Sequence, residues 1–212
     1  MKRMLCMLVA LTLLFAAATA SAAVVSKTTT DNTTVNNIVT VDNTVIEETF
    51  VVEIAQDEEE VVQEISNLYT FVVAEQKAPV EYFPVEVQEK VAEILPEEVK
   101  AETLECTEFV TVRELGYKET YGDVVVNFSF TTQYKAQQKV VVLMGFYTGE
   151  VDEAGNPIVE WMPIEATALE DGTLDVTMTQ EMLTKFGEAK TVAMAVLSEQ
   201  TELEAAPVVP AA

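Results

Sequence analysis

The side chains in this sequence that are best suited to chemistry are carboxylates. Acidic residues outnumber basic ones by 36 to 12, which gives a formal charge of −24. Two turn-like segments gather the oxygen ligands that calcium prefers. They hold Asp152, Glu153 and Asn156 in one case, and Glu170, Asp171 and Asp175 in the other. Neither segment has the spacing of an EF-hand loop, and turns are rich in Asp and Gly for backbone reasons alone. We therefore expect calcium binding that is weak, at most in roughly the millimolar range.

Paired carboxylates can also hydrolyse glycosidic bonds, because that reaction needs one acid and one base or nucleophile and no histidine. With so many acidic residues, chance pairs are expected throughout the chain. A catalytic pair also needs one pKa raised by burial, which a sequence does not display. A carboxylate-dependent secreted hydrolase is therefore an alternative interpretation, and a non-enzymatic protein is the favoured one.

The sequence contains no histidine, which removes Ser-His and Cys-His catalytic pairs, His-ligated metals and the usual proton shuttle near neutral pH. No G-x-G-x-x-G, G-x-x-x-x-G-K-[ST] or G-x-S-x-G motif is present, so phosphate cradles and nucleophile elbows are excluded. Nucleic-acid binding is also excluded, because neutralising phosphates requires clustered Lys and Arg. We expect no cofactor and no nucleic-acid partner.

Aromatic residues in the second half of the chain are candidates for contacting a partner, since exposed aromatics stack on sugar rings or anchor proteins. The candidates are Tyr117, Tyr121, Tyr134, Tyr147 and Trp161. Trp161 has apolar neighbours, and a core position is the simpler interpretation for it. A protein- or glycan-binding surface is predicted if several of these rings share one exposed patch.

The N-terminus has the layout of a secretory signal peptide over residues 1–22: a basic start, an apolar run from Met4 to Ala18 and small residues at the cleavage site. The apolar run is shorter than the roughly 20 residues that span a membrane. We expect secretion, cleavage and no membrane attachment afterwards. Cleavage removes two basic and no acidic residues, so the charge becomes −26. Cys106 is then the only cysteine, either a small buried residue or half of an intermolecular disulfide.

The elements that must position these residues change character along the chain. Residues 23–44 are rich in Thr and Asn and predict a flexible, β-prone lead, although part of it could pair as an edge strand. Residues 45–104 predict an acidic helical segment that begins with a strand. One helix is expected from Asp57, with a following apolar run that either extends it or forms a strand, and a second helix is expected after Pro84.

From residue 105 to about residue 200 the apolar period is two, which predicts about six strands joined by short turns. Within Lys139–Tyr147 the run VVVLMGFY is apolar throughout, as expected of a central strand covered on both sides. Asp171-Gly172 is a hairpin signal, and residues 179–187 predict a short helix that caps the core. The pattern is typical of an antiparallel β-sandwich, and residues 201–212 are expected to form a tail.

A resemblance follows from the YFPVEVQEKV helix, the YGDVVVNFSFTTQYKAQQKVVVLMGFY strand pair, the VEWMPIEATALEDGTLDVTM hairpin and the closing AVLSE. Over residues 82–198 the chain resembles uncharacterised secreted domains of Gram-positive gut bacteria. The resemblance implies export and a fold that is mainly β, with a small helical segment before a C-terminal antiparallel immunoglobulin-like β-sandwich. No activity is assigned to those domains, so no functional residue is implied.

Together these features predict a secreted, acidic, non-enzymatic protein that serves as a structural or binding module for an extracellular protein or glycan partner. A strand-adding inhibitor or assembly subunit is a further alternative. An unpaired sheet edge beside residues 38–54 would favour strand addition. Two convergent carboxylates in a closed polar cleft would favour the hydrolase, and a flat aromatic patch would favour surface binding.

Overall fold

A computed structural model describes residues 33–40, 44–46, 50–55, 58–153 and 155–199. The signal peptide expected over residues 1–22, most of the lead and the tail at 201–212 therefore lie outside the described residues. No helix within the described ranges is long and apolar enough to cross a membrane.

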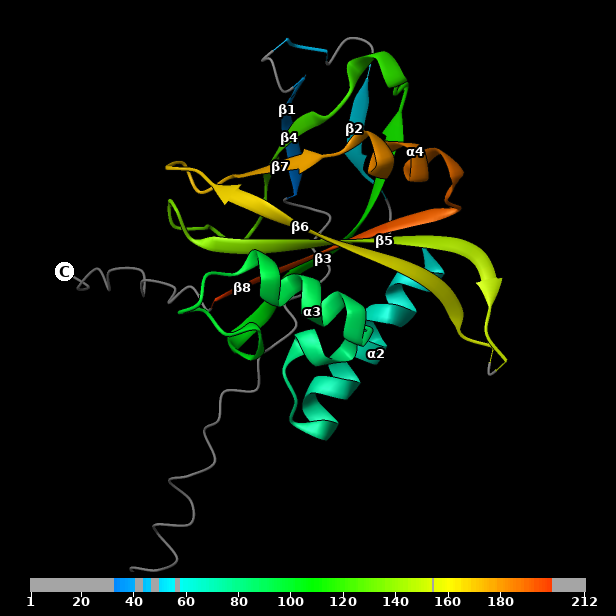
Figure 1. Ribbon diagram of the computed structural model, residues 1–212. Helices are drawn as coiled ribbons and strands as arrows, with labels where there is room; N and C mark the ends of the chain where they lie inside the picture. Colours follow the sequence, from blue (N-terminus) through cyan, green and yellow to red (C-terminus); the bar gives the residue numbers. More distant parts are fainter. Residues whose placement is uncertain (1–32, 41–43, 47–49, 56–57, 154, 200–212) are drawn as a thin grey trace, which may run out of the picture.

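The described strands form a single antiparallel sheet that curls nearly into a barrel (Figure 1). Its eight strands have the order β1-β4-β7-β6-β5-β8-β3-β2. They are β1 Thr34–Thr40, β2 Val51–Ile54, β3 Leu104–Leu115, β4 Val124–Ser129, β5 Lys139–Val151, β6 Pro157–Ala168, β7 Leu174–Met178 and β8 Thr191–Glu199. The mainly β prediction is confirmed. An immunoglobulin-like sandwich of two sheets is not confirmed, because neighbouring described strands are hydrogen-bonded in one continuous series.

The inside of this nearly closed sheet is filled by alternate side chains of its strands. Along β5, Val140, Val142 and Met144 point into the barrel core. The intervening residues, Val141 and Leu143, point outward into a second core. All five are buried, so β5 is covered on both faces, as its unbroken apolar run predicts.

The second core lies between the outer face of β3, β8, β5 and β6 and a layer of helices, which Figure 1 shows below the central strands. This layer consists of α2 Glu59–Glu75, η2 Pro79–Tyr82, α3 Val85–Ile94 and η3 Ala101–Thr103. In α2, Val61, Leu68 and Val72 are buried at helical spacing, so the apolar run after Leu68 extends the helix and forms no strand.

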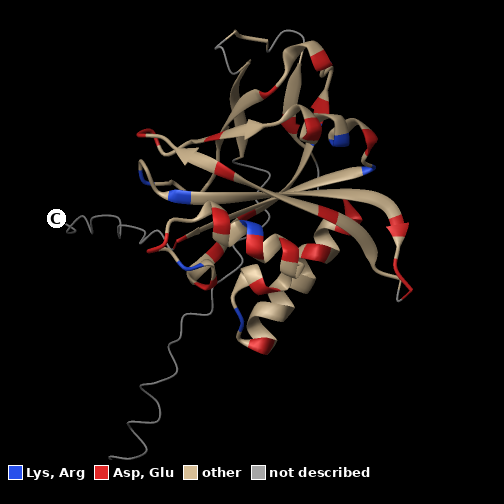
Figure 2. Ribbon diagram, viewed as in Figure 1, with Lys and Arg blue, Asp and Glu red and all other residues tan. Residues whose placement is uncertain are grey.

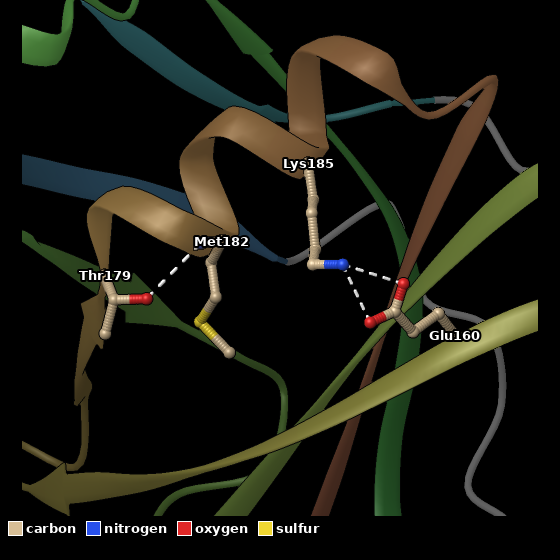
Figure 3. A network of polar contacts seen from close by, with 4 residues as sticks. All are labelled: Glu160, Thr179, Met182 and Lys185. Atoms are coloured by element: carbon tan, nitrogen blue, oxygen red, sulfur yellow. Dashed lines mark hydrogen bonds and ion pairs between the residues drawn. The ribbon is translucent and has the colours of Figure 1, made fainter.

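A third helix, α4 Gln180–Glu188, closes one end of the barrel core with Met182, Leu183 and Phe186. Its first turn is capped by the Thr179 hydroxyl, which accepts the Met182 N–H at 3.3 Å. Figure 3 shows that the Lys185 ammonium reaches across to β6, where it contacts both carboxylate oxygens of Glu160 at 2.8 Å. The capping helix expected over residues 179–187 is therefore present.

The sheet contains strands from the part of the chain before residue 104 and from the part after it. The lead over residues 23–44, which was expected to be flexible, contains β1. This strand pairs with β4 at the edge of the sheet, so the alternative prediction of an edge strand in the lead is the one that the structure shows. The strand expected over Val45–Ile54 is interrupted: Val45 bridges to Val39 of β1, and β2 pairs with β3. The acidic segment thus contributes helices on the outer face and one edge of the sheet.

Candidate functional site: a groove between the two sheet edges

The two edges of the sheet, β1 and β2, lie side by side where the barrel nearly closes. Each is paired on one side only, β1 with β4 and β2 with β3. Among the described residues no strand ladder joins β1 to β2. Part of the β1 edge is covered by the chain that follows it, because the Ile46 N–H donates to the Ile38 carbonyl at 3.3 Å. The remainder of the two edges borders a groove.

This groove has a volume of about 190 Å³. It is lined by Val35, Asn36, Asn37, Ile38, Phe50, Val51 and Val52. Ile38, Phe50 and Val52 are buried and form an apolar floor that is continuous with the barrel core. Asn36, Asn37 and Val51 are exposed at the rim, and Val51 is 41% exposed. Apolar floor, polar rim and strand backbone are thus brought together in one place.

A break in the alternation of β1 shapes this rim. The register between β1 and β4 shifts between Val35 and Asn37, which is a β-bulge of the kind that occurs at sheet edges. The extra residue leaves two consecutive asparagines, Asn36 and Asn37, exposed while Val35 and Ile38 pack against the barrel core. The adjacent pair of asparagines within TVNNIVT is the sequence signal for this feature.

A buried asparagine on the neighbouring strand fixes β1 in place. The Asn36 amide donates to Asn127 Oδ1 at 2.7 Å. The Asn127 amide in turn donates to Asp175 Oδ1 at 2.6 Å and to Thr173 Oγ1 at 3.0 Å. Because Asn127 is only 5% exposed, these hydrogen bonds satisfy a polar group that would otherwise be costly to bury. The network ties the open edge to β4 and β7.

An aromatic cluster packs beside the groove. Phe50, immediately before β2, contacts the ring of Tyr117 at 5.7 Å and that of Tyr121 at 6.4 Å between centroids. Both tyrosines come from the segment between β3 and β4 and are half-buried. Burial, followed by the neighbouring carboxylates, with Asp123 first, raises the pKa of Tyr117. The structure therefore brings together two of the five aromatic residues expected to bind a partner, next to the sheet edges.

The other three candidate aromatics are buried in separate places. Tyr134 is in the barrel core, with its hydroxyl 3.0 Å from the Thr107 hydroxyl. Tyr147 and Trp161 lie in the outer core beneath the helices. The Trp161 ring packs edge-on against Phe83 at 4.9 Å. Because these three rings are buried, they do not form a surface patch with Tyr117 and Tyr121. A binding role for the set of five stays a prediction.

One carboxylate in each of the two loops considered for calcium is engaged in local structure. Asp152 accepts the Asn156 N–H at 2.8 Å, and Asp171 accepts the Thr173 hydroxyl at 2.7 Å, which is the largest cause of its lowered pKa. Both loops proposed for calcium are therefore held by their own turns. In the described part of the chain, no three or more acidic or cysteine side chains are grouped as a metal ion would require. Weak calcium binding stays a prediction.

The carboxyl groups that come nearest to an acid–base pair are on α2. Burial raises the pKa of Glu64, and a hydrogen bond donated by the Tyr82 hydroxyl opposes this shift. A hydrogen bond donated by Lys190 lowers the pKa of Glu60. Opposite shifts on neighbouring carboxyls are what catalysis requires. Neither residue lines the groove. Neither lines a pocket of about 80 Å³ beside Thr111 or one of about 230 Å³ beside Tyr147. Small-molecule sites usually occupy about 300–1,000 Å³.

Cys106 is fully buried and free, and burial is the main cause that raises its pKa to about 12. The Cys106 thiol is thus a small buried group in the core, which is one of the two interpretations that the sequence left open for this residue.

Searches with this chain found no matching protein-family model, no matching curated protein and no matching solved structure. The groove, its asparagine rim and Phe50 were not singled out by sequence reasoning. Residues 38–54 were considered only as the neighbourhood of a possible open edge. The groove residues become neighbours only through the pairing of β1 with β4 and of β2 with β3.

Proposed function

We propose that the protein is an extracellular, non-enzymatic binding module that holds an extended segment of a partner protein along the groove between β1 and β2. The observation that carries this proposal is the juxtaposition of two open strand edges over an apolar floor. Strand edges offer backbone hydrogen bonds to an incoming strand, and a floor between them offers a pocket for alternate side chains.

The size of the groove suits a side chain of a peptide better than a small-molecule substrate. Its volume of about 190 Å³ lies below the range of about 300–1,000 Å³ for ligand pockets. The buried floor of Ile38, Phe50 and Val52 favours a large apolar side chain. Tyr117 and Tyr121 add half-exposed rings of the type enriched at interaction hot spots.

The charge of the chain favours a basic partner. The charge of −26 expected after cleavage attracts cationic surfaces and repels anionic ones over a distance of about 8 Å at physiological salt. The proposed ligand is therefore an extended segment with an apolar side chain for the floor and basic residues on its flanks. Glycan binding by a flat aromatic surface receives less support, because Tyr134, Tyr147 and Trp161 are buried.

Strand parity limits how the segment can pair. Every neighbouring pair in the sheet is antiparallel, so with eight strands β1 and β2 run antiparallel to each other. The segment can therefore run antiparallel to only one of the two edges. Cα atoms of β1 and β2 come within 8 Å of each other, which is less than the roughly 9.6 Å that a strand inserted between them needs, so the segment pairs with one edge and covers the other. The extracellular location rests on the signal-peptide layout of residues 1–22 and on the resemblance to secreted immunoglobulin-like domains.

The test is a comparative capture from the native extracellular milieu, read out by mass spectrometry. The baits are the wild type, Val51→Lys at the groove rim and Val151→Lys as a control with the same change at an exposed site on β5. Lysine on an edge strand opposes strand pairing. We expect one partner that is retained by the wild type and V151K and lost by V51K.

Hydrogen exchange with the captured partner then locates the contact. We expect new protection at the backbone amides of Thr34–Asn37 and Val51–Ile54. A partner that binds V51K as well as the wild type, or protection confined to the helices, would contradict the proposal. Turnover of a substrate that is abolished by Glu64→Gln would support the hydrolase instead.

A further inference from the structure

The open part of the β1 edge is short and lies at the beginning of that strand. The Thr40 N–H donates to the Thr44 carbonyl at 2.9 Å, and the Ile46 N–H donates to the Ile38 carbonyl. The second half of β1 is therefore covered by the chain that follows it. Residues 34–37 have no strand ladder on this side among the described residues. They form the β1 wall of the groove together with Ile38.

The segment that comes immediately before this wall is residues 23–32, AVVSKTTTDN. We call it the N-terminal arm. It lies outside the described residues, which begin at Thr33, two residues before Val35 of the groove. Signal cleavage after residue 22 makes the arm the new N-terminus. The arm is thus attached directly to one wall of the groove.

We propose that the N-terminal arm folds back along β1 and covers the groove in the free protein, so that a partner must displace it. This inference rests on the proposed function of the groove as a site for an extended segment. Thr30–Asn32 suits a three-residue hairpin turn, because Asp and Asn favour turns and Asn tolerates the left-handed conformation at its end. The arm then runs antiparallel to β1.

The length and the apolar residues of the arm match the groove. The residues before the turn, Val24–Thr29, extend over about 20 Å, whereas the wall Val35–Ile38 extends over about 13 Å. A three-residue turn brings the Val24–Val25 pair beside Ile38, which belongs to the apolar floor. Successive side chains of a strand point to opposite faces, so one valine of this pair faces the floor in either register.

Charge also favours the arm as the occupant. It contains Lys27 and Asp31, and cleavage adds an amino terminus, so two positive groups and one negative group give it a net charge of +1. Figure 2 shows that acidic residues far outnumber basic ones on the described strands and helices. Glu53 follows Val52 of the floor, is 46% exposed, and is 4.0 Å from its ion-pair partner Arg113. A cation on the arm is therefore attracted to this end of the molecule, whereas a second copy of the chain is repelled.

Tethering distinguishes the arm from any free segment of the same chemistry. A short flexible tether holds a ligand at an effective concentration of about 1 mM, so weak contacts are enough to close the groove. A free partner then binds with an affinity that is reduced by the fraction of molecules whose groove is open. The arm thus regulates access to the groove.

Hydrogen exchange on the mature chain alone tests the proposal. The wild type is compared with Val24→Asp/Val25→Asp and with Val208→Asp/Val209→Asp, which makes the same change at the other end of the chain. We expect the amides of Thr34–Asn37 and Val51–Ile54 to exchange about tenfold faster or more in V24D/V25D and at the wild-type rate in V208D/V209D. A synthetic AVVSKTTTDN peptide at a few millimolar should restore the protection in V24D/V25D.

Circular dichroism checks that each variant is folded. Equal exchange in the wild type and V24D/V25D overturns the proposal, and so does a peptide that restores no protection. Equal acceleration by V208D/V209D also overturns it, because charge alone would then explain the effect. Protection that grows with protein concentration overturns it as well, since the arm of another copy would then be the occupant.

The capture experiment separates this inference from the proposed function. V24D/V25D should retain more partner than the wild type, because its groove is open. Faster exchange in V24D/V25D, with no partner retained by either chain, supports the arm and overturns the proposed function. Equal retention of a partner, with unchanged exchange in V24D/V25D, overturns the arm and supports the proposed function.

Discussion

A single methyl group added at Gly145 is expected to destabilise the outer core. A Cβ on Gly145 of β5 would lie 2.5 Å, 2.6 Å and 2.8 Å from three carbon atoms of the Trp161 ring on the paired strand β6. Real Cβ atoms show almost no contacts below 3.0 Å, so the ring must move. Its space to move is limited, because Trp161 is 8% exposed and packs against Phe83 at 4.9 Å and Phe109 at 6.0 Å.

The magnitude follows from two opposing effects of Gly145→Ala. Alanine reduces the conformational freedom of the unfolded chain, which favours folding by about 0.4–1 kcal/mol. Overpacking a filled core costs about 1–3 kcal/mol, and the clash here involves a large rigid ring. The clash therefore dominates, and we expect a net loss of about 1–2 kcal/mol in the free energy of unfolding.

Denaturant unfolding followed by far-UV circular dichroism measures this loss in every variant, including those that lack Trp161, the only tryptophan. The double variant G145A/W161L supplies the control. Removing the ring should make the alanine neutral or favourable, so the two substitutions should be strongly non-additive. A G145A protein as stable as the wild type would refute the packing argument, as would simple additivity in the double variant.

Four further outcomes are expected. Asn127→Ala should lower the free energy of unfolding by about 1–3 kcal/mol and speed hydrogen exchange in β1, because it leaves Asp175 without the amide it accepts from. Tyr147→Phe should be neutral or raise the thermal midpoint, since the Tyr147 hydroxyl is buried without a hydrogen-bond partner among the described residues. Cys106 should resist a thiol reagent at pH 8 until the protein is unfolded, because burial raises its pKa to about 12. Burial also raises the pKa of Glu64 in the folded state, so ionisation of this carboxyl opposes folding. Glu64→Gln should therefore raise the thermal midpoint at about pH 7. At about pH 3 the carboxyl is protonated in both the folded and the unfolded state, so the thermal midpoint should not change.

Much of the local structure could be predicted from apolar spacing. The two helices before residue 104 and the capping helix α4 follow from residues at helical spacing, and β4 and β7 follow from alternation. The two-sided burial of β5 follows from its unbroken apolar run. These predictions succeed because each depends on neighbours within one element.

Closure of the sheet depends on contacts between distant parts of the chain, which spacing does not encode. Strand β1 pairs with β4 across about ninety residues, as Asn36 and Asn127 illustrate. A sandwich and a nearly closed barrel share the same alternation along each strand. The two folds differ in which strands are neighbours. The sequence therefore predicted the strands but not their order in the sheet.

The candidate site was only partly predictable for the same reason. The criterion of an open edge beside residues 38–54 pointed to the part of the chain that forms the groove. The aromatic candidates were less informative, because a ring on a strand may face either the core or solvent. Tyr147 illustrates this: it occupies a strand covered on both faces, where even an outward-pointing ring is buried.

The double coverage of β5 bears on how the protein resists proteolysis. The only cysteine within the described residues is unpaired, so no disulfide there restrains partial opening. Lifting the helices would uncover Val141, Leu143 and Tyr147, whose strand also forms the wall of the barrel core. Detaching the helices would therefore strip one cover from the strand that also walls the barrel core, so we expect cleavage within β5 to require more than local opening of the helix layer.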